Sequence, residues 1–423
     1  MKPGLHTLTV LLPVLAWGCG EASYNEIELM PAPTVFETGA VDPFQGRNAE
    51  TLSQHATLFY ATDRQVAGPE DASEFYANKR GVALRVGTAR VQMDPPIQDW
   101  TSLREITLSA DRPIDPKISV ISTQEIGPLP FSSSDETGAP LPSDETALAA
   151  RAFSDAINAQ LRISGNADVF IYIHGYNVDF EYPTLVAKEL QHYLGYQGAF
   201  ISYNWPASPS RLAYFKDLET ADATRRNLRE LITFLSQKTN ARRVHLIGYS
   251  AGSRLAFEAA YQVALQSKAA GRRTAKLGQV ILIGSDLDRT YFTQALADDL
   301  LGGMDHLTLY MSESDAALRL SEIVFGRNRL GQIKRDEVLP GDVAAKLVEE
   351  TRLSLIDASH ASGANLGNGH WYFRSSPWVS SDIFLTLLGN DLPQRRGLVR
   401  RAPQDPIWTF PADYEARAGS NTN

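Results

Sequence analysis

From residue 168 onward, short apolar runs rich in β-branched and aromatic residues alternate with stretches of helical periodicity. The runs are VFIYIHG, GAFISYNWP, VHLIGYS, QVILIGSD, HLTLYMS and LSLIDAS. Continuous apolar runs of this length are typical of strands buried on both faces. Between two of them, Leu228, Leu231 and Leu235 recur at the spacing of one helix face. This alternation predicts an α/β fold with a mostly parallel sheet covered by helices on both faces.

Shorter β-type segments precede this region and predict extra N-terminal strands. They lie at 56–64, 81–93, 104–110 and 117–123, and a helix is expected at 147–161. We therefore expect one domain over 51–390. Its β-rich part is 51–145, its core is 146–390, and a linker at 20–50 and a tail at 391–423 flank it. In the tail, Trp408 and Phe410 are expected to dock on the domain.

Composition restricts the class of partner. The chain has 423 residues, a formal net charge of −9 and no long run of Lys and Arg. Nucleic-acid binding depends on concentrated positive charge, so it is disfavoured. The composition does not indicate an oligomeric state.

The N-terminus has the features of an export signal. Lys2 precedes an apolar stretch at 8–17 that is too short to span a bilayer, and the only cysteine, Cys19, follows it. Residues 1–19 resemble a bacterial lipoprotein signal, in which Cys19 would be lipidated. We therefore expect an exported, membrane-anchored lipoprotein of a bacterial cell envelope, in the periplasm or at the outer membrane. A soluble periplasmic or secreted protein, and an apolar N-terminus arising by chance, are the alternatives.

The candidate nucleophile is Ser250 in GYSAG, where an apolar run passes directly into a helical pattern. This strand–turn–helix context is the one that a nucleophile elbow requires. Gly248 and Gly252 fit a strained turn in which backbones approach closely. The alternative is a Gly-rich turn that contains a serine with no catalytic role.

A second motif, HGYN at 174–177, follows an earlier apolar run. In an esterase-like sheet, the backbone at this place donates a hydrogen bond to the developing oxyanion. We expect the donors to be the N–H groups of Tyr176 and Ala251. His174 precedes the serine in the chain, so it is expected to brace this loop, with a structural turn as the alternative.

Two histidines follow the last apolar run and are candidates for the general base. His370 lies in a Gly/Asn-rich loop that suits an exposed imidazole, and His360 is the rival. His245 and His306 lie in or at the start of strands and are expected to be structural.

The base requires a carboxylate that fixes its tautomer. Asp315 follows the run HLTLYMS and gives the chain order Ser, Asp, His of α/β hydrolases. Asp286, Asp288 and Glu313 are alternatives, and any of the aspartates could instead cap a helix.

Further residues are candidates for the substrate pocket. His174, Asn177 and Trp205 are expected to line it, and Tyr214 and Phe215 either cover it or pack elsewhere. A metal site has little support, because there is no cysteine set and no HExxH motif, and His360 and His370 form too loose a pair. The predicted chemistry requires no cofactor.

Seven segments together resemble the bacterial α/β hydrolases grouped as the uncharacterised DUF900 family. They are ATDR, HGYN, SYNWPASP, GYSAG, GSDLD, YMSESDAAL and GHWYF, and the resemblance covers residues 55–390. It implies an α/β-hydrolase fold with Ser250 as nucleophile, Asp315 as acid and His370 as base, and it implies no particular substrate. The lipoprotein-like start and an insertion at 327–351 depart from the family pattern.

The sequence thus predicts a serine hydrolase that cleaves an ester or related acyl bond of a small or lipid-like substrate through an acyl-enzyme. An amidase, a thioesterase or an acyltransferase would carry the same residues. A surface binding protein that kept the fold without turnover is the alternative of another class.

Overall fold

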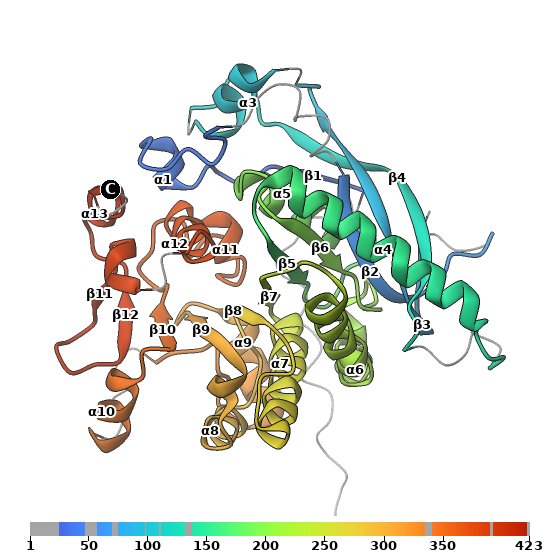
Figure 1. The fold of residues 1–423 in the computed structure, drawn as a ribbon. Coiled ribbons are helices and arrows are strands. Elements are labelled where there is room, and N and C mark those ends of the chain that lie inside the picture. The colour runs from blue at the N-terminus through green and yellow to red at the C-terminus, as the bar shows by residue number, and fades with distance from the viewer. Residues whose placement is uncertain are drawn as a thin grey trace, which may run out of the picture.

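The computed structural model describes residues 25–46, 57–69, 75–97, 99–109, 111–131, 138–334, 341–389 and 392–420. The strands in these residues form one mixed sheet (Figure 1). They are β1 (Glu26–Glu28), β2 (Thr57–Val66), β3 (Tyr76–Asp94), β4 (Lys117–Pro128), β5 (Asp168–Ile173), β6 (Ala199–Tyr203), β7 (Arg243–Tyr249), β8 (Leu277–Ile283), β9 (Met304–Met311), β10 (Leu353–Asp357), β11 (Val399–Arg400) and β12 (Ile407–Thr409). Their spatial order is β1-β4-β3-β2-β6-β5-β7-β8-β9-β10-β12-β11.

The centre of the sheet is parallel and its two edges are antiparallel. From β2 to β12 every neighbouring pair is parallel. β1, β4, β3 and β2 pair antiparallel at one edge, as do β11 and β12 at the other. The predicted α/β fold with a mostly parallel sheet and extra N-terminal strands is therefore confirmed.

Helices pack on both faces of the sheet (Figure 1). They are α1 (Thr34–Glu37), α3 (Trp100–Thr107), α4 (Ser143–Ser164), α5 (Glu181–Tyr193), α6 (Tyr214–Lys238), α7 (Ala251–Ala270), α8 (Arg289–Ala297), α9 (Ala316–Phe325), α10 (Gly341–Glu349), α11 (Tyr372–Ser375), α12 (Pro377–Leu387) and α13 (Tyr414–Ser420). One apolar cluster includes α4, α6, α7 and α8, and a second, on the other face, includes α1, α5, α12 and α13. All residues of β5 are buried between the two layers, and each large apolar side chain so buried contributes about 1.5–3 kcal/mol.

This arrangement brings the candidate residues to one edge of the sheet. β5, β7, β9 and β10 are parallel, so the loops that follow them leave from the same side. In open α/β sheets this carboxyl edge is where ligands bind.

One expected strand is a helix. Residues 100–107, which overlap the strand expected at 104–110, form α3. Asp99 caps this helix, because its side chain accepts a hydrogen bond from the Ser102 N–H at 2.9 Å. Trp100, Leu103 and Thr107 are buried on one helix face. The cap and this buried face outweigh the β propensity of the segment.

Residues 25–46 belong to the folded body, so the expected linker does not extend through them. β1 pairs with β4, and the Phe36 and Phe44 side chains are buried. The apolar residues between the prolines of this segment explain the difference, because they pack against the second cluster and against α3. Cys19 and the predicted signal at 1–19 lie outside the described residues.

The expected tail also contributes to the fold. β12 pairs with β10 as a strand of the main sheet. Trp408 is half-buried and Phe410 is buried. Within the described part of the chain, no helix combines the length and the apolar character needed to cross a membrane.

Candidate active site

Ser250 lies in a strained turn between β7 and α7. Its φ of 53° and ψ of −125° are values that residues other than glycine rarely adopt. A Cβ on Gly252 would lie 2.1 Å from the His174 carbonyl oxygen, and one on Gly248 would lie 2.7 Å from the Ser253 Cα. Glycine at both positions therefore allows the turn to pack against the end of β5 and the start of α7.

His370 and Asp315 lie in a hydrogen-bonded chain with this serine. The His370 Nε2 is 2.9 Å from the Ser250 Oγ, and the His370 Nδ1 is 2.6 Å from the Asp315 Oδ2. An ionised carboxylate only accepts hydrogen bonds, so Nδ1 carries the proton and the lone pair of Nε2 faces the serine hydroxyl. An imidazole in this position can remove the proton of that hydroxyl.

Three neighbouring elements hold the two partners in place. Asp315 is fully buried and also caps α9, since its Oδ1 accepts from the Leu318 N–H at 3.0 Å. The Tyr249 ring lies 5.0 Å from the His370 ring. A Cβ on Gly284, at the end of β8, would lie 3.1 Å from the His370 Cε1. The imidazole is therefore packed between the ends of β7 and β8.

The residues that the sequence left as alternatives have other contacts. His360 is exposed. Asp286 accepts a hydrogen bond from the Tyr214 hydroxyl at 3.0 Å, and Asp288 caps α8. Glu313 lines a cavity with Arg319 and Ile323.

The segment 174–180, here called the β5 loop, packs directly against the serine. A Cβ on Gly175 would lie 3.1 Å from the Ser250 Cβ. Tyr176 follows at once, and Asn177 has a positive φ of 62°. This proximity brings the backbone of Tyr176 close to the turn that contains Ser250 and Ala251.

Buried contacts of His174 and Trp205 support the β5 loop. Both are buried, and their rings stack with centroids 5.1 Å apart. The Trp205 Nε1 donates to the His174 carbonyl at 2.7 Å, and the His174 Nδ1 lies 2.6 Å from the Gly175 carbonyl. Burial, and next the charge of Arg64, lower the pKa of His174 to about 3. The ring is therefore neutral and donates to Gly175.

Arg64 was not predicted to act at this site. Its guanidinium is buried, and its Nη2 donates to the Val178 and Asp179 carbonyls of the β5 loop at 3.2 and 2.9 Å. Its Nη1 donates to the Asn78 side chain at 2.6 Å. The one sequence signal at Arg64 is the ATDR segment, which carries part of the family resemblance and indicates no role for the arginine.

Asp217 is a second residue that sequence reasoning missed. Its carboxylate is buried and accepts from the Ser208 N–H. Burial raises its pKa, and the amide groups of Ser208 and Asn177 oppose this rise. Asp217 thus connects the β5 loop to the segment that follows β6.

Aromatic side chains continue from the β5 loop to the surface. The Tyr176 ring lies edge-to-face on the Tyr214 ring, with centroids 5.0 Å apart. Tyr214 is half-buried and Phe215 is exposed. Tyr214 thus packs against the β5 loop, and the exposed Phe215 ring lies beside it, with centroids 5.8 Å apart.

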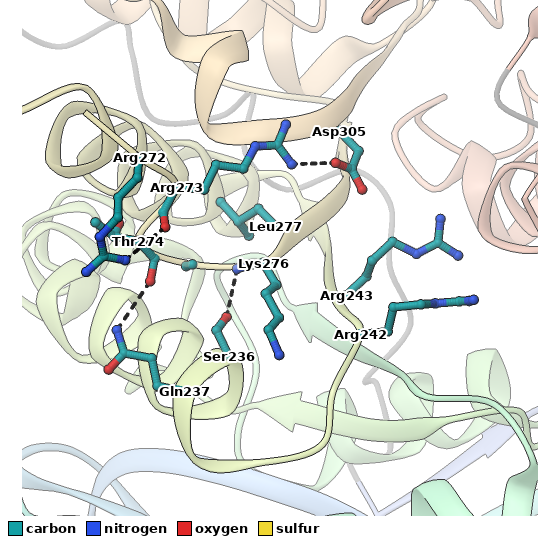
Figure 2. A pocket seen from close by; sticks show the side chains of 11 residues that line it. Ser236, Gln237, Arg242, Arg243, Arg272, Arg273, Thr274, Lys276, Leu277 and Asp305 are labelled. Carbon is teal, nitrogen blue, oxygen red and sulfur yellow. Dashed lines mark hydrogen bonds and ion pairs between the residues drawn. The ribbon is translucent and has the colours of Figure 1, made fainter. Parts of the chain in front are cut away.

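A basic cavity of about 490 Å³ lies at the opposite edge of the sheet, at the amino ends of β7, β8 and β9 (Figure 2). Arg242 and Arg243 in its wall both bond to the buried Asp168, and Arg273 bonds to Asp305. Hydrogen bonds thus join the starts of β5 and β7, away from Ser250. Nowhere in the described residues do three or more His, Cys, Asp or Glu side chains gather as a metal site.

Comparison with known proteins gave one family match. Residues 149–390, more than half of the chain, match the family described as alpha/beta hydrolase of unknown function (DUF900). No curated protein matches.

Solved structures show weak similarity. Esterase B from Lactobacillus rhamnosis, inhibited by a C4-C4 SN3 tributyrin phosphonate, has 21% identity and a TM-score of 0.24. The alignment covers 38% of this chain and 59% of that one, so the chain spans about six-tenths of the length of that esterase. A lipase-esterase related protein from Clostridium acetobutylicum has 13% identity and a TM-score of 0.21, over 53% of this chain and 90% of that one.

Proposed function

Because the chain belongs to the α/β hydrolase family DUF900, we propose that it is a serine hydrolase that cleaves an ester or related acyl bond. The observation that carries this proposal is the pair of distances, 2.9 and 2.6 Å, that link Ser250 to His370 and His370 to Asp315. A serine hydroxyl is a weak nucleophile unless a base lies within hydrogen-bond reach.

In the proposed reaction, the His370 Nε2 takes the proton of Ser250 while the Oγ attacks the substrate carbonyl carbon. The π electrons of the carbonyl move to its oxygen, which accepts hydrogen bonds from the N–H groups of Ala251 and Tyr176. The imidazolium then protonates the leaving oxygen, and the acyl–oxygen bond breaks. Water repeats the sequence on the acyl-enzyme, releasing the acid and restoring the serine proton. Asp315 stabilises the imidazolium throughout.

The first test is labelling with a fluorophosphonate probe, followed by mapping of the modified peptide. Labelling is expected at Ser250, and it should disappear in Ser250→Ala and His370→Ala. His360→Ala is the matched control, because His360 lies in the same loop and is exposed. The control should label as the wild type does. Failure to label folded wild-type protein would overturn the proposal and favour a non-catalytic binding protein.

The leaving group is tested next. Amidases, thioesterases and acyltransferases would share the same three residues. Turnover of an acetyl ester, thioester and anilide of matched size ranks these activities. An alcohol added as an acyl acceptor would reveal a transferase, because a new ester of that alcohol would form.

A further inference from the structure

Exposed apolar residues gather beside the candidate site. Leu212 is 82% exposed, Phe215 is 61% exposed and Phe325 is 36% exposed. The Phe215 and Phe325 rings lie 5.8 Å apart, although one belongs to α6 and the other to the end of α9. Single exposed apolar residues are common, but a gathered group marks an interaction site. Leu212 lies three residues before Phe215, in the short 3-10 helix Arg211–Ala213 that leads directly into α6. We call Leu212, Phe215 and Phe325 the apolar rim.

The apolar rim is continuous with the site. Tyr214 connects the two, because its ring lies 5.0 Å from the Tyr176 ring and 6.2 Å from the Phe325 ring. The helix that carries Phe325 begins at its cap, Asp315. A molecule bound at Ser250 would therefore meet the rim on leaving the β5 loop.

Polar contacts hold this surface in place. The Tyr214 hydroxyl donates to the Asp286 Oδ2 at 3.0 Å, and Arg329 donates to the Asp286 carbonyl at 2.9 Å. The guanidinium of Arg329 also lies 4.4 Å from the Phe325 ring centroid, on its inner side, since Arg329 is buried. Tyr214 and Phe325 thus form a fixed apolar surface, and such a surface binds an apolar ligand with little loss of side-chain entropy.

We propose that the apolar rim binds the unbranched acyl chain of the substrate. The substrate class is then esters of medium- and long-chain acids. This inference rests on the proposed function, because it assigns the acyl group that Ser250 would carry. The rim offers a long acyl chain apolar contact over several methylene groups, whereas an acetyl group has no methylene to place on it.

The experiment is an acyl series of p-nitrophenyl esters from acetate to decanoate, each below its critical micelle concentration. In the wild type, kcat/KM should rise with chain length by up to about fourfold for each methylene that the rim buries. In Phe215→Ser and Leu212→Ser, the octanoate-to-acetate ratio of kcat/KM should fall at least about tenfold. Phe215→Leu should recover most of the ratio, since it keeps an apolar side chain.

Ile323→Ser is the matched control. Ile323 lies on the same helix as Phe325 and is 74% exposed. Two residues apart on a helix is a rotation of about 200°, and Ile323 instead lines a separate cavity with Glu313 and Arg319. The octanoate-to-acetate ratio of Ile323→Ser should equal that of the wild type.

Each contrary result has its own meaning. A wild type that hydrolyses acetate with a flat acyl profile overturns the role of the rim and leaves the proposed function intact. If the wild type neither turns over any ester nor reacts with the fluorophosphonate, both the role of the rim and the proposed function are overturned. Activity that appears only with micelles or vesicles overturns the proposal in favour of a lipid surface as the occupant. If kcat/KM depends on the length of the ester's alcohol chain and not on that of its acyl chain, the assignment of the rim to the acyl chain is overturned. If the wild type is a dimer that Phe215→Ser dissociates, and the acyl profile of kcat/KM is unchanged, the rim is an interface between two copies and the proposal is overturned.

Discussion

Replacing Arg64 tests whether the β5 loop must be held in position for turnover. The Arg64 guanidinium is fully buried and bonds to the Val178 and Asp179 carbonyls at 3.2 and 2.9 Å. Arg64→Met keeps most of the apolar stem and removes all of these hydrogen bonds. The backbone of Tyr176, two residues before Val178, then loses a support.

The expected change in stability is small because two effects oppose each other. Two buried carbonyls left without a donor cost about 2–6 kcal/mol together. Burial lowers the pKa of Arg64 to about 10, although nearby carboxylates, Asp179 foremost, oppose the shift. This net shift corresponds to about 3 kcal/mol that methionine does not incur. The free energy of unfolding should therefore change by between a gain of about 1 kcal/mol and a loss of about 3 kcal/mol. In contrast, loss of one well-placed oxyanion donor lowers kcat by about 10²- to 10³-fold.

The assay combines thermal unfolding with steady-state kinetics on the best ester of the acyl series. Arg64→Met should remain folded with kcat about 10²-fold lower and KM changed little, because an oxyanion donor acts mainly in the transition state. Arg64→Lys should be intermediate, since one ammonium cannot reproduce the planar fork. Arg90→Met, an exposed arginine on the neighbouring strand β3, is the control. A folded Arg64→Met with kcat within threefold of the wild type would refute this reasoning.

Three further predictions concern other positions. Burial raises the pKa of the Asp63 carboxyl to about 7, so the folded state binds this proton more tightly than the unfolded state. The stability contributed by this group is fully present below about pH 4 and is lost as the pH rises through about 7. Asp63→Asn should abolish this pH-dependent loss, which amounts to about 4 kcal/mol in the free energy of unfolding. Identical pH profiles of melting temperature for the two proteins would contradict this prediction. Asp315→Asn should keep the helix cap but favour the wrong His370 tautomer, lowering kcat about 10⁴-fold, and kcat above a tenth of the wild-type value would argue against the assigned role. Cys19 should be the lipidated N-terminus of the mature protein, and the mass of the N-terminal peptide decides this.

The central strands could be predicted from the sequence because a strand buried on both faces requires a continuous run of apolar, β-branched residues. β5 has all its residues buried, and all of them after Asp168 lie within one of the apolar runs. The segment at 104–110 had no such signal, and its short β-type run became part of α3 once Asp99 capped the helix. Residues 25–46 were misjudged for a related reason. Their apolar side chains are separated by prolines and acids, so no period links them.

The contrast between His370 and Arg64 explains which site residues a sequence can identify. Both contact residues more than a hundred positions away. The chain has only 8 histidines but 40 lysines and arginines, and the base of a serine nucleophile is restricted by its chemistry to very few residue types. Elimination therefore leaves two candidates for the base. No comparable restriction applies to a cation that supports a loop, because the three-dimensional position of the carbonyls alone selects it. The same holds for Phe215 and Phe325 of the apolar rim, whose rings become neighbours only when the fold brings the start of α6 to the end of α9.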